Sequence, residues 1–158
     1  MSILVTGAAG FIGSNFVKLL LDKTTEPVIS FDALTYAGNL DNLRSITHSN
    51  HTFIKGDICN QADTDQLFSA HQINTIYHFA AESHVDRSIQ SSDPFIQTNV
   101  VGTQRLLDAS KQANVSKFIH VSTDEVYGES ELNESSKTEM NLFICVRKLQ
   151  EMFLYTIK

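Results

Sequence analysis

The sequence predicts an α/β domain in which a doubly wound parallel sheet of about five strands carries helices on both faces. Three observations support this fold class. Short runs rich in β-branched and aromatic residues alternate with longer stretches of helical periodicity. Runs such as ILVT and KFIHVS are almost continuously apolar, as expected for strands buried on both faces. Glycines follow the first run directly and open the first helical stretch.

The elements are expected in the order βαβαβαβαβ. The strands are predicted at 3–6, 28–32, 52–55, 75–80 and 117–122. The helices between them are predicted at 11–21, 40–46, 63–70 and 94–113. The polar stretch 129–141 (ESELNESSKTEMN) is expected to be a surface loop, and a last helix is expected at 142–157. A doubly wound sheet of this kind normally has six strands, so one strand fewer is expected here.

Composition limits the possible functions. The chain has 158 residues, 42% of them hydrophobic and 19% charged, which suits one folded domain over residues 1–158. Its formal net charge of −6 argues weakly against nucleic acid or an anionic membrane as a partner. No apolar stretch approaches about 20 residues, and we expect no signal peptide, no metal site and a cytoplasmic location. Cys59 and Cys145 form no CxxC pair, consistent with a reducing compartment.

The segment GAAGFIG has the residues of a dinucleotide-binding turn. Gly7, Gly10 and Gly13 would allow a tight turn and let backbone N–H groups approach a pyrophosphate at a helix N-terminus. Asp32 ends the second predicted strand, 19 residues after Gly13, where a carboxylate accepts hydrogen bonds from ribose hydroxyls. The same charge would repel a 2′-phosphate, which favours NAD over NADP. The alternative is an ordinary strand–turn–helix with a solvated aspartate.

A second acid, Asp57, ends the third predicted strand. In this layout its carboxylate could accept from an adenine amino group, with Ile58 packing beside the ring. An aspartate at this place is equally expected as a helix N-cap or turn residue. The residues alone leave both interpretations open.

Several segments together resemble a known family. GAAGFIGSNF, FDALTYAGNL, GDI, HFAAESHVDRSI, TNVVGT and VSTDEVYG are similar to the nucleotide-sugar 4,6-dehydratases of the extended short-chain dehydrogenase superfamily, and within it most similar to the dTDP-glucose 4,6-dehydratase group. The resemblance is strong over 1–128 and weak over 129–158. It implies a Rossmann-like fold, an NAD cofactor, a nucleotide-sugar substrate such as dTDP-glucose, and a possible homodimer. The residues do not distinguish a dTDP-sugar from a UDP-sugar.

The resemblance also implies which residues contact the cofactor. They follow the ends of the first four predicted strands or lie in TNVVGT: Gly7, Gly10, Phe11, Ile12, Gly13, Asp32, Leu34, Thr35, Asp57, Ile58, Phe79, Ala80, Ala81, Glu82, Ser83 and Thr98. Ser83 would also contact substrate. By pattern alone, core packing at a strand end is the better explanation of FAA, and an ordinary place on a helix face is the better explanation of Asn99. His84, Asp86 and Arg87 could form a local polar network or touch substrate.

VSTDEVYG places two adjacent acids after the fifth predicted strand. By resemblance Asp124 is the general acid, Glu125 the general base, and Thr123 binds the sugar near its 4-hydroxyl group. Removing water from adjacent carbons needs one proton acceptor and one proton donor, and neighbouring carboxylates raise each other's pKa. Epimerases of the superfamily usually carry small hydroxyl residues here, so the pair favours dehydration. The alternative is a solvated acidic turn.

One expected motif is missing. The superfamily uses Tyr-x-x-x-Lys, in which a lysine stands four residues after a tyrosine. Four residues after Tyr36, Tyr77 and Tyr127 come Leu40, Ala81 and Glu131, and Tyr155 is too close to Lys158. Lys148 matches the family lysine, which puts Ile144 where the tyrosine belongs, and Lys148 could equally be a solvated helix residue.

The family's C-terminal substrate domain is also expected to be absent. We therefore expect weak NAD binding and little turnover from a truncated or divergent dehydratase-type lyase. The alternatives are a non-catalytic NAD-binding module or remnant, and a UDP-sugar dehydratase or epimerase relative.

Overall fold

A computed structural model describes residues 1–122 of the chain. Five parallel strands form one sheet in the order β3-β2-β1-β4-β5. The strands are β1 Ser2–Thr6, β2 Val28–Asp32, β3 His51–Lys55, β4 Ile73–His78 and β5 Lys117–His120. The order reverses direction between β1 and β4, which makes that point the switch point of a doubly wound sheet. The predicted fold class is therefore confirmed.

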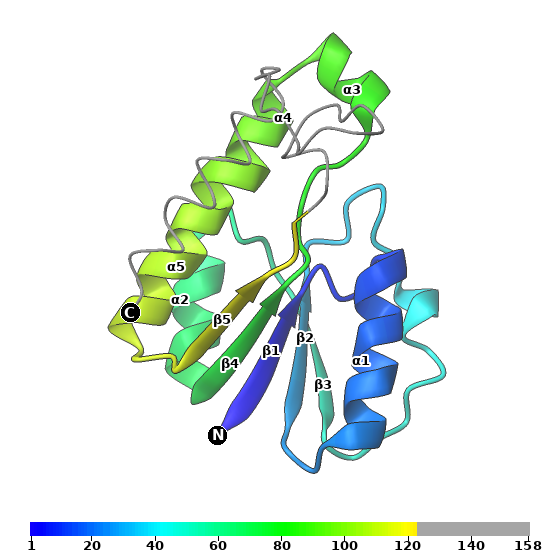
Figure 1. Ribbon diagram of the computed structural model, residues 1–158, viewed down its shortest axis with the longest axis vertical. Helices are drawn as coiled ribbons and strands as arrows, with labels where there is room; N and C mark the ends of the chain where they lie inside the picture. Colours follow the sequence, from blue (N-terminus) through cyan, green and yellow to red (C-terminus); the bar gives the residue numbers. More distant parts are fainter. Residues whose placement is uncertain (123–158) are drawn as a thin grey trace, which may run out of the picture.

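Helices cover both faces of the sheet (Figure 1). Helix α1 (Phe11–Lys23) lies on one face, and α2 (Gln61–Ala70) and α5 (Thr103–Gln112) lie on the other. Two short helices, α3 (Val85–Gln90) and α4 (Asp93–Phe95), lie beyond the carboxyl ends of the strands (Figure 1). None of the helices described in 1–122 is long and apolar enough to cross a membrane.

The core has one layer on each side of the sheet, because successive strand residues point to opposite faces. In β1, Leu4 belongs to the cluster that packs on α2 and α5, whereas Val5 belongs to the cluster that packs on α1. Both side chains are fully buried. The central strands β1 and β2 are buried along their whole length, which explains their apolar sequence.

The helix predicted at 40–46 is wrong. The structure has only a short 3₁₀ helix, η1 (Leu40–Asn42), followed by turns. The Asn39 side chain accepts from the Asp41 N–H, and the next backbone bonds run from each N–H to the carbonyl three residues earlier. Because these are three-residue closures, they tighten the chain into turns instead of an α-helix.

The helix predicted at 94–113 is present as one helical run but is not regular. Between α4 and α5 lies a π-helical stretch, η2 (Ile96–Gly102). Such wide turns displace side chains from α-helical register and often occur at functional sites. Asn99 lies within η2 and is buried.

Smaller differences concern the ends of elements. Helix α2 begins at Gln61 because the Asn60 side chain caps it by accepting from the Ala62 N–H. Strand β4 covers 73–78 where 75–80 was predicted, and β5 ends at His120. Helix α3 was not predicted. The loop expected at 129–141 and the helix expected at 142–157 lie outside the described residues.

Candidate functional site

The carboxyl ends of β1, β2 and β4 meet at the switch point of the sheet. A parallel sheet sends all of its carboxyl ends to one edge, and β1 lies between β2 and β4. The glycine loop, Asp32 and the segment beginning at Phe79 therefore come together, although 72 residues separate Gly7 from Phe79. Three of the five segments predicted to bind a dinucleotide meet here.

The glycine loop is a tight turn pressed against the segment after β4. Gly7 has a φ of +64°, and a Cβ at Gly7 would lie 2.6 Å from the Ala80 backbone nitrogen. A Cβ at Gly13 would collide with the Gly7 carbonyl group. Gly10 is the N-cap of α1 and has no side chain, so the first N–H groups of the helix donate to no capping side chain. The backbone therefore requires glycine at Gly7 and Gly13.

Phe11 and Ile12 follow in the first turn of α1. Both side chains are mostly exposed, at 82% and 63% of their surface. Two large apolar side chains at the mouth of the switch point are available to a ligand lying on the loop.

Asp32 ties the glycine loop to the segment after β2. Its Oδ2 atom accepts a hydrogen bond from the Ala9 N–H at 2.8 Å, and its Oδ1 accepts one from the Leu34 N–H at 2.8 Å. The residue is only 8% exposed. A carboxylate oxygen has two acceptor positions, so each oxygen retains one for a ligand hydroxyl. The structure thus gives Asp32 a loop-fixing contact that the sequence did not suggest.

The segment after β2 has an unusual backbone. Leu34 adopts a φ of +56°, a region that non-glycine residues rarely enter. Thr35 is exposed, and its carbonyl accepts from the Gly38 N–H at 3.1 Å. A Cβ at Gly38 would lie 2.6 Å from Asp32 Oδ1, so a glycine is needed there to let the chain pass the carboxylate.

Asp57 and Ile58 lie after β3, the edge strand two positions from β1 in the sheet. The Asp57 carboxylate accepts from the Cys59 N–H at 2.8 Å, which is the turn role considered as the alternative. Burial, together with the nearby Asp57 carboxylate, raises the pKa of the Cys59 thiol to about 11. Ile58 is only 4% exposed and belongs to the core cluster on the α2 and α5 face. Adenine contacts by these two residues stay a prediction.

The segment after β4 is held by Asn99. Its Oδ1 atom accepts from the Glu82 N–H and its Nδ2 group donates to the Glu82 carbonyl, both at 2.8 Å. The buried amide of η2 thereby pairs with both backbone groups of a residue 17 positions earlier, as a neighbouring strand would. These two hydrogen bonds fix the backbone at Glu82, within the predicted site residues from Ala80 to Ser83.

The other predicted residues of this segment differ in exposure. The Phe79 ring packs 5.1 Å from the Phe16 ring in the α1-side cluster, so core packing accounts for it. Ala81 and Ser83 are exposed beside the switch point. Thr98 is half-buried, with its Oγ1 4.0 Å from Cys59 Sγ.

A buried chain of polar side chains supports the same segment from beneath. His78 Nδ1 lies 2.6 Å from Thr6 Oγ1, and His78 Nε2 lies 3.0 Å from Thr103 Oγ1. Thr6 Oγ1 also accepts from the Ala80 N–H at 3.3 Å. Burial first, and the charge of His120 second, lower the pKa of His78 to about 3. A neutral histidine therefore links α5, β4 and β1 to the first residues of the candidate site.

Sequence reasoning assigned no role to Thr6 and His78. The signal available was a polar residue inside an otherwise apolar strand, which usually has a partner when it is buried. The partner itself could not be predicted because Thr6 and His78 are 72 positions apart.

Tyr36 adds a contact across the switch point. The Arg87 guanidinium lies over its ring, 4.1 Å from the centroid, and the His84 ring meets it edge-on at 6.4 Å. Burial first, and the carboxylate of Glu82 second, raise the pKa of Tyr36, while Arg87 acts in the opposite direction. His84 and Arg87 thus belong to a polar network, one of the two possibilities that the sequence left open.

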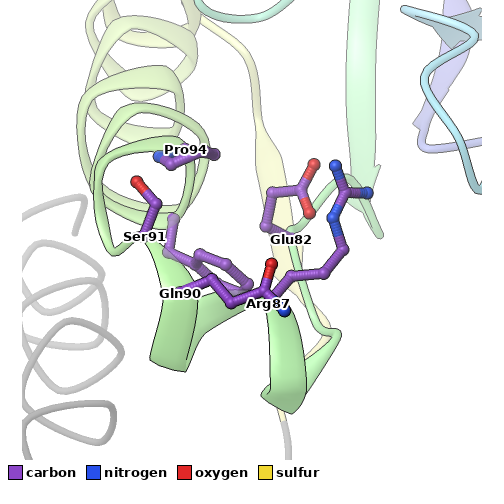
Figure 2. A pocket seen from close by; sticks show the side chains of 6 residues that line it. Glu82, Arg87, Gln90, Ser91 and Pro94 are labelled. Atoms are coloured by element: carbon purple, nitrogen blue, oxygen red, sulfur yellow. The ribbon is translucent and has the colours of Figure 1, made fainter.

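A cavity of about 150 Å³ lies beside the Glu82 segment. Figure 2 shows Glu82 and Arg87 on one side of it and Ser91 and Pro94 on the other. Ligand pockets for small molecules are typically about 300–1,000 Å³, so this cavity alone is too small for a dinucleotide. In the described part of the chain, no cluster of three or more His, Cys, Asp or Glu side chains could hold a metal ion.

Four predicted site residues lie outside the described residues: Thr123, Asp124, Glu125 and Lys148. The last described residues, Val121 and Ser122, directly follow β5. The roles assigned to the four residues therefore stay predictions from the sequence.

The chain is similar to proteins of known activity. It is 55% identical over 130 residues to the low-salt glycan biosynthesis protein Agl12 of Haloferax volcanii, a match covering 82% of this chain and 41% of the relative. It is 45% identical over 139 residues to dTDP-glucose 4,6-dehydratase of Salmonella typhimurium, covering 82% of this chain and 38% of that enzyme. The chain thus spans about two fifths of the length of the curated relatives it matches.

The structural comparison agrees. The dTDP-glucose 4,6-dehydratase DesIV of Streptomyces venezuelae, solved with NAD bound, superposes with a TM-score of 0.89 at 42% identity, covering 99% of this chain and 51% of that one. The sequence model of the family described as GDP-mannose 4,6 dehydratase matches residues 4–144, well over half of the chain. The chain therefore belongs to the GDP-mannose 4,6 dehydratase family, and its relatives include dTDP-glucose 4,6-dehydratases.

Proposed function

We propose that this chain binds NAD at the switch point, as the NAD-binding part of a dTDP-glucose 4,6-dehydratase-type lyase. The observation that carries the proposal is Asp32, whose buried carboxylate is fixed by the Ala9 and Leu34 N–H groups at 2.8 Å each. A carboxylate held at this place accepts ribose hydroxyls and repels a 2′-phosphate, which selects NAD over NADP.

The residues present fit the rest of a dinucleotide. The turn at Gly7 packs too closely on the Ala80 backbone to admit a Cβ, and it leads directly into the N-terminus of α1, where a pyrophosphate would approach backbone N–H groups. Phe11 and Ile12, in the first turn of α1, would contact it from the helix side. Asp57 retains carboxylate acceptor capacity beyond its bond to the Cys59 N–H, which leaves it able to accept from an adenine amino group.

At the other end, Ala80, Ala81 and Ser83 would line the nicotinamide, with Thr98 nearby. Asn99 and Thr6 hold the backbone of this segment through the bonds to Glu82 and Ala80. NAD, when bound, would accept a hydride from the sugar and later return it, so the net reaction is loss of water.

The proton steps belong to the residues after β5. Glu125 would take the proton from C5 of the glucosyl unit, and Asp124 would protonate the departing C6 hydroxyl. Thr123 would hold the sugar near its 4-hydroxyl group, together with Ser83. Similarity to dTDP-glucose 4,6-dehydratases supports these assignments, and dTDP-glucose is the substrate we propose.

The second candidate is a non-catalytic NAD-binding module. It is favoured by one feature of the sequence: Ile144 stands four residues before Lys148, where the family pattern has a tyrosine. Without a phenolate to take the proton from the C4 hydroxyl, hydride transfer lacks its base. We therefore propose that this chain binds NAD but turns over little or no substrate by itself.

Calorimetric titration of the full 158-residue chain tests the binding proposal. NAD⁺ should bind, NADP⁺ should bind at least about tenfold more weakly, and Asp32→Ala should abolish the preference. Asp41→Asn, an exposed acid close by in the chain, serves as the matched control and should change nothing. No NAD⁺ binding, or equal binding of both dinucleotides, would refute the proposal.

Turnover is tested separately, by the alkaline absorbance of the 4-keto-6-deoxy product from dTDP-glucose. Little or no product is expected from the chain alone. Robust product formation would exclude the non-catalytic module and contradict the assigned need for the tyrosine.

A further inference from the structure

Four side chains join the segment after β2 to the segment after β4. Tyr36 comes from the first segment, and Glu82, His84 and Arg87 come from the second. Arg87 lies over the Tyr36 ring at 4.1 Å and His84 meets the ring edge-on. Because β2 and β4 are the two neighbours of β1, this contact bridges the end of β1, where the glycine loop lies.

The contact does not serve to hold either segment in place by itself. The segment after β2 has its own anchors, since the Leu34 N–H bonds Asp32 and the Asn39 N–H donates to the Ala9 carbonyl at 3.0 Å. The segment after β4 is held by the two hydrogen bonds between the Asn99 side chain and the Glu82 backbone. What the Tyr36–Arg87 contact adds is a fixed position of one segment relative to the other.

The bridge is also poorly explained by packing. The Tyr36 side chain is 51% exposed and Arg87 is exposed as well. An exposed cation–π contact contributes little to folding, and neither side chain belongs to a core cluster. The Tyr36–Arg87 contact lies between the two segments that the proposed dinucleotide site uses, and this position points to a role in binding.

We propose that Tyr36 and Arg87 are positioning residues that couple the adenosine end of the dinucleotide site to its nicotinamide end. This inference rests on the proposed NAD binding. A dinucleotide must contact both segments at once, whereas a mononucleotide needs only the segment after β2. If the contact already holds the two segments together, most molecules have the conformation that can bind a dinucleotide, which we call the competent state. The apparent affinity for NAD⁺ is then higher.

The test uses Tyr36→Ala and Arg87→Met in the full chain, titrated with NAD⁺ and with AMP. Loss of an exposed cation–π contact should lower the equilibrium constant for forming the competent state by about two- to fivefold, and the Kd for NAD⁺ should rise by up to that factor. The Kd for AMP should not change. Ile89→Ala, an exposed change in the same short helix as Arg87, is the matched control and is expected to retain wild-type affinity for NAD⁺.

The double variant adds a second readout. If the two residues act as a pair, combining the changes should weaken NAD⁺ binding no more than either change alone. Additive effects, an unchanged NAD⁺ affinity, or an equal loss of AMP affinity would each overturn the proposal. A wild-type chain that binds no NAD⁺ would refute the proposed function itself. A wild-type chain that binds NAD⁺ as well as the variants do would refute only the coupling.

Discussion

The buried histidine of β4 should make the stability of the domain fall in mild acid. His78 has no exposed surface, and both of its ring nitrogens lie within 3.0 Å of threonine hydroxyls. Burial and, second, the His120 ring at 5.1 Å lower its pKa to about 3. In the unfolded chain the pKa of the same ring returns to about 6.5.

The direction in which the free energy of unfolding changes with pH follows from which state binds a proton at His78. Above pH 6.5 neither state protonates His78, and the histidine makes no pH-dependent contribution. As the pH falls below 6.5, the unfolded chain takes up a proton that the folded domain refuses, so the free energy of unfolding decreases. One pKa unit corresponds to about 1.4 kcal/mol, so the loss between pH 7 and 4.5 is about 2.5 kcal/mol, and it reaches about 4 kcal/mol at pH 3.

Urea unfolding at several pH values between 7 and 4.5 measures this effect. The comparison is between the wild-type chain and His78→Asn, because groups that titrate elsewhere contribute equally to both and cancel in the difference. His78→Asn should be less stable at pH 7, since it breaks the threonine contacts, but its stability should fall less steeply with acid. His48→Asn, at an exposed position, should keep the wild-type slope. Equal slopes for wild type and His78→Asn would refute the reasoning.

Two further predictions concern the backbone of the site. Gly7→Ala should lower the free energy of unfolding by about 2 kcal/mol or more, because an L-residue is strained at a φ of +64° and its Cβ would meet backbone. The control is Gly10→Ala, at a φ of −73°, which should lower the free energy of unfolding by less than about 1 kcal/mol. Equal losses for the two variants would contradict the argument. Asn99→Leu should lower the free energy of unfolding by about 2–3 kcal/mol, because it removes two hydrogen bonds and strands the Glu82 backbone groups. Gln97→Leu is an exposed change on the same helical run and should change the free energy of unfolding by no more than about 0.5 kcal/mol in the same urea experiment. A loss comparable to that of Asn99→Leu would show that the experiment measured helix propensity and not the Asn99–Glu82 hydrogen bonds.

The parts of this fold that depend on local pattern were predictable. An apolar run of four to six residues between turns indicates a buried strand whatever its neighbours, and all five described strands were predicted within about two residues. The glycine turn and Asp32 were predictable for a similar reason: both lie in one strand–turn–helix–strand unit, where spacing along the chain determines proximity.

Local pattern failed where backbone geometry depends on detail. The apolar periodicity at 40–46 looks the same for an α-helix and for a series of three-residue turns, and only the backbone bonds, each to the carbonyl three residues earlier, distinguish them. The π-helical turns of η2 are likewise invisible to a periodicity of 3.6, yet they lie where Asn99 reaches Glu82.

The remaining contacts arise only when distant segments meet. His78 with Thr6, Asn99 with Glu82, and Arg87 with Tyr36 are each separated by many residues, and none of these side chains reveals its partner by type or spacing. Strand order brings them together, because placing β1 between β2 and β4 makes their loops neighbours. The amino-acid pattern therefore specifies the strands, the glycine turn and the position of the aspartate after β2, whereas the packing of the sheet decides how the site is held, since that depends on distances in space and not along the chain.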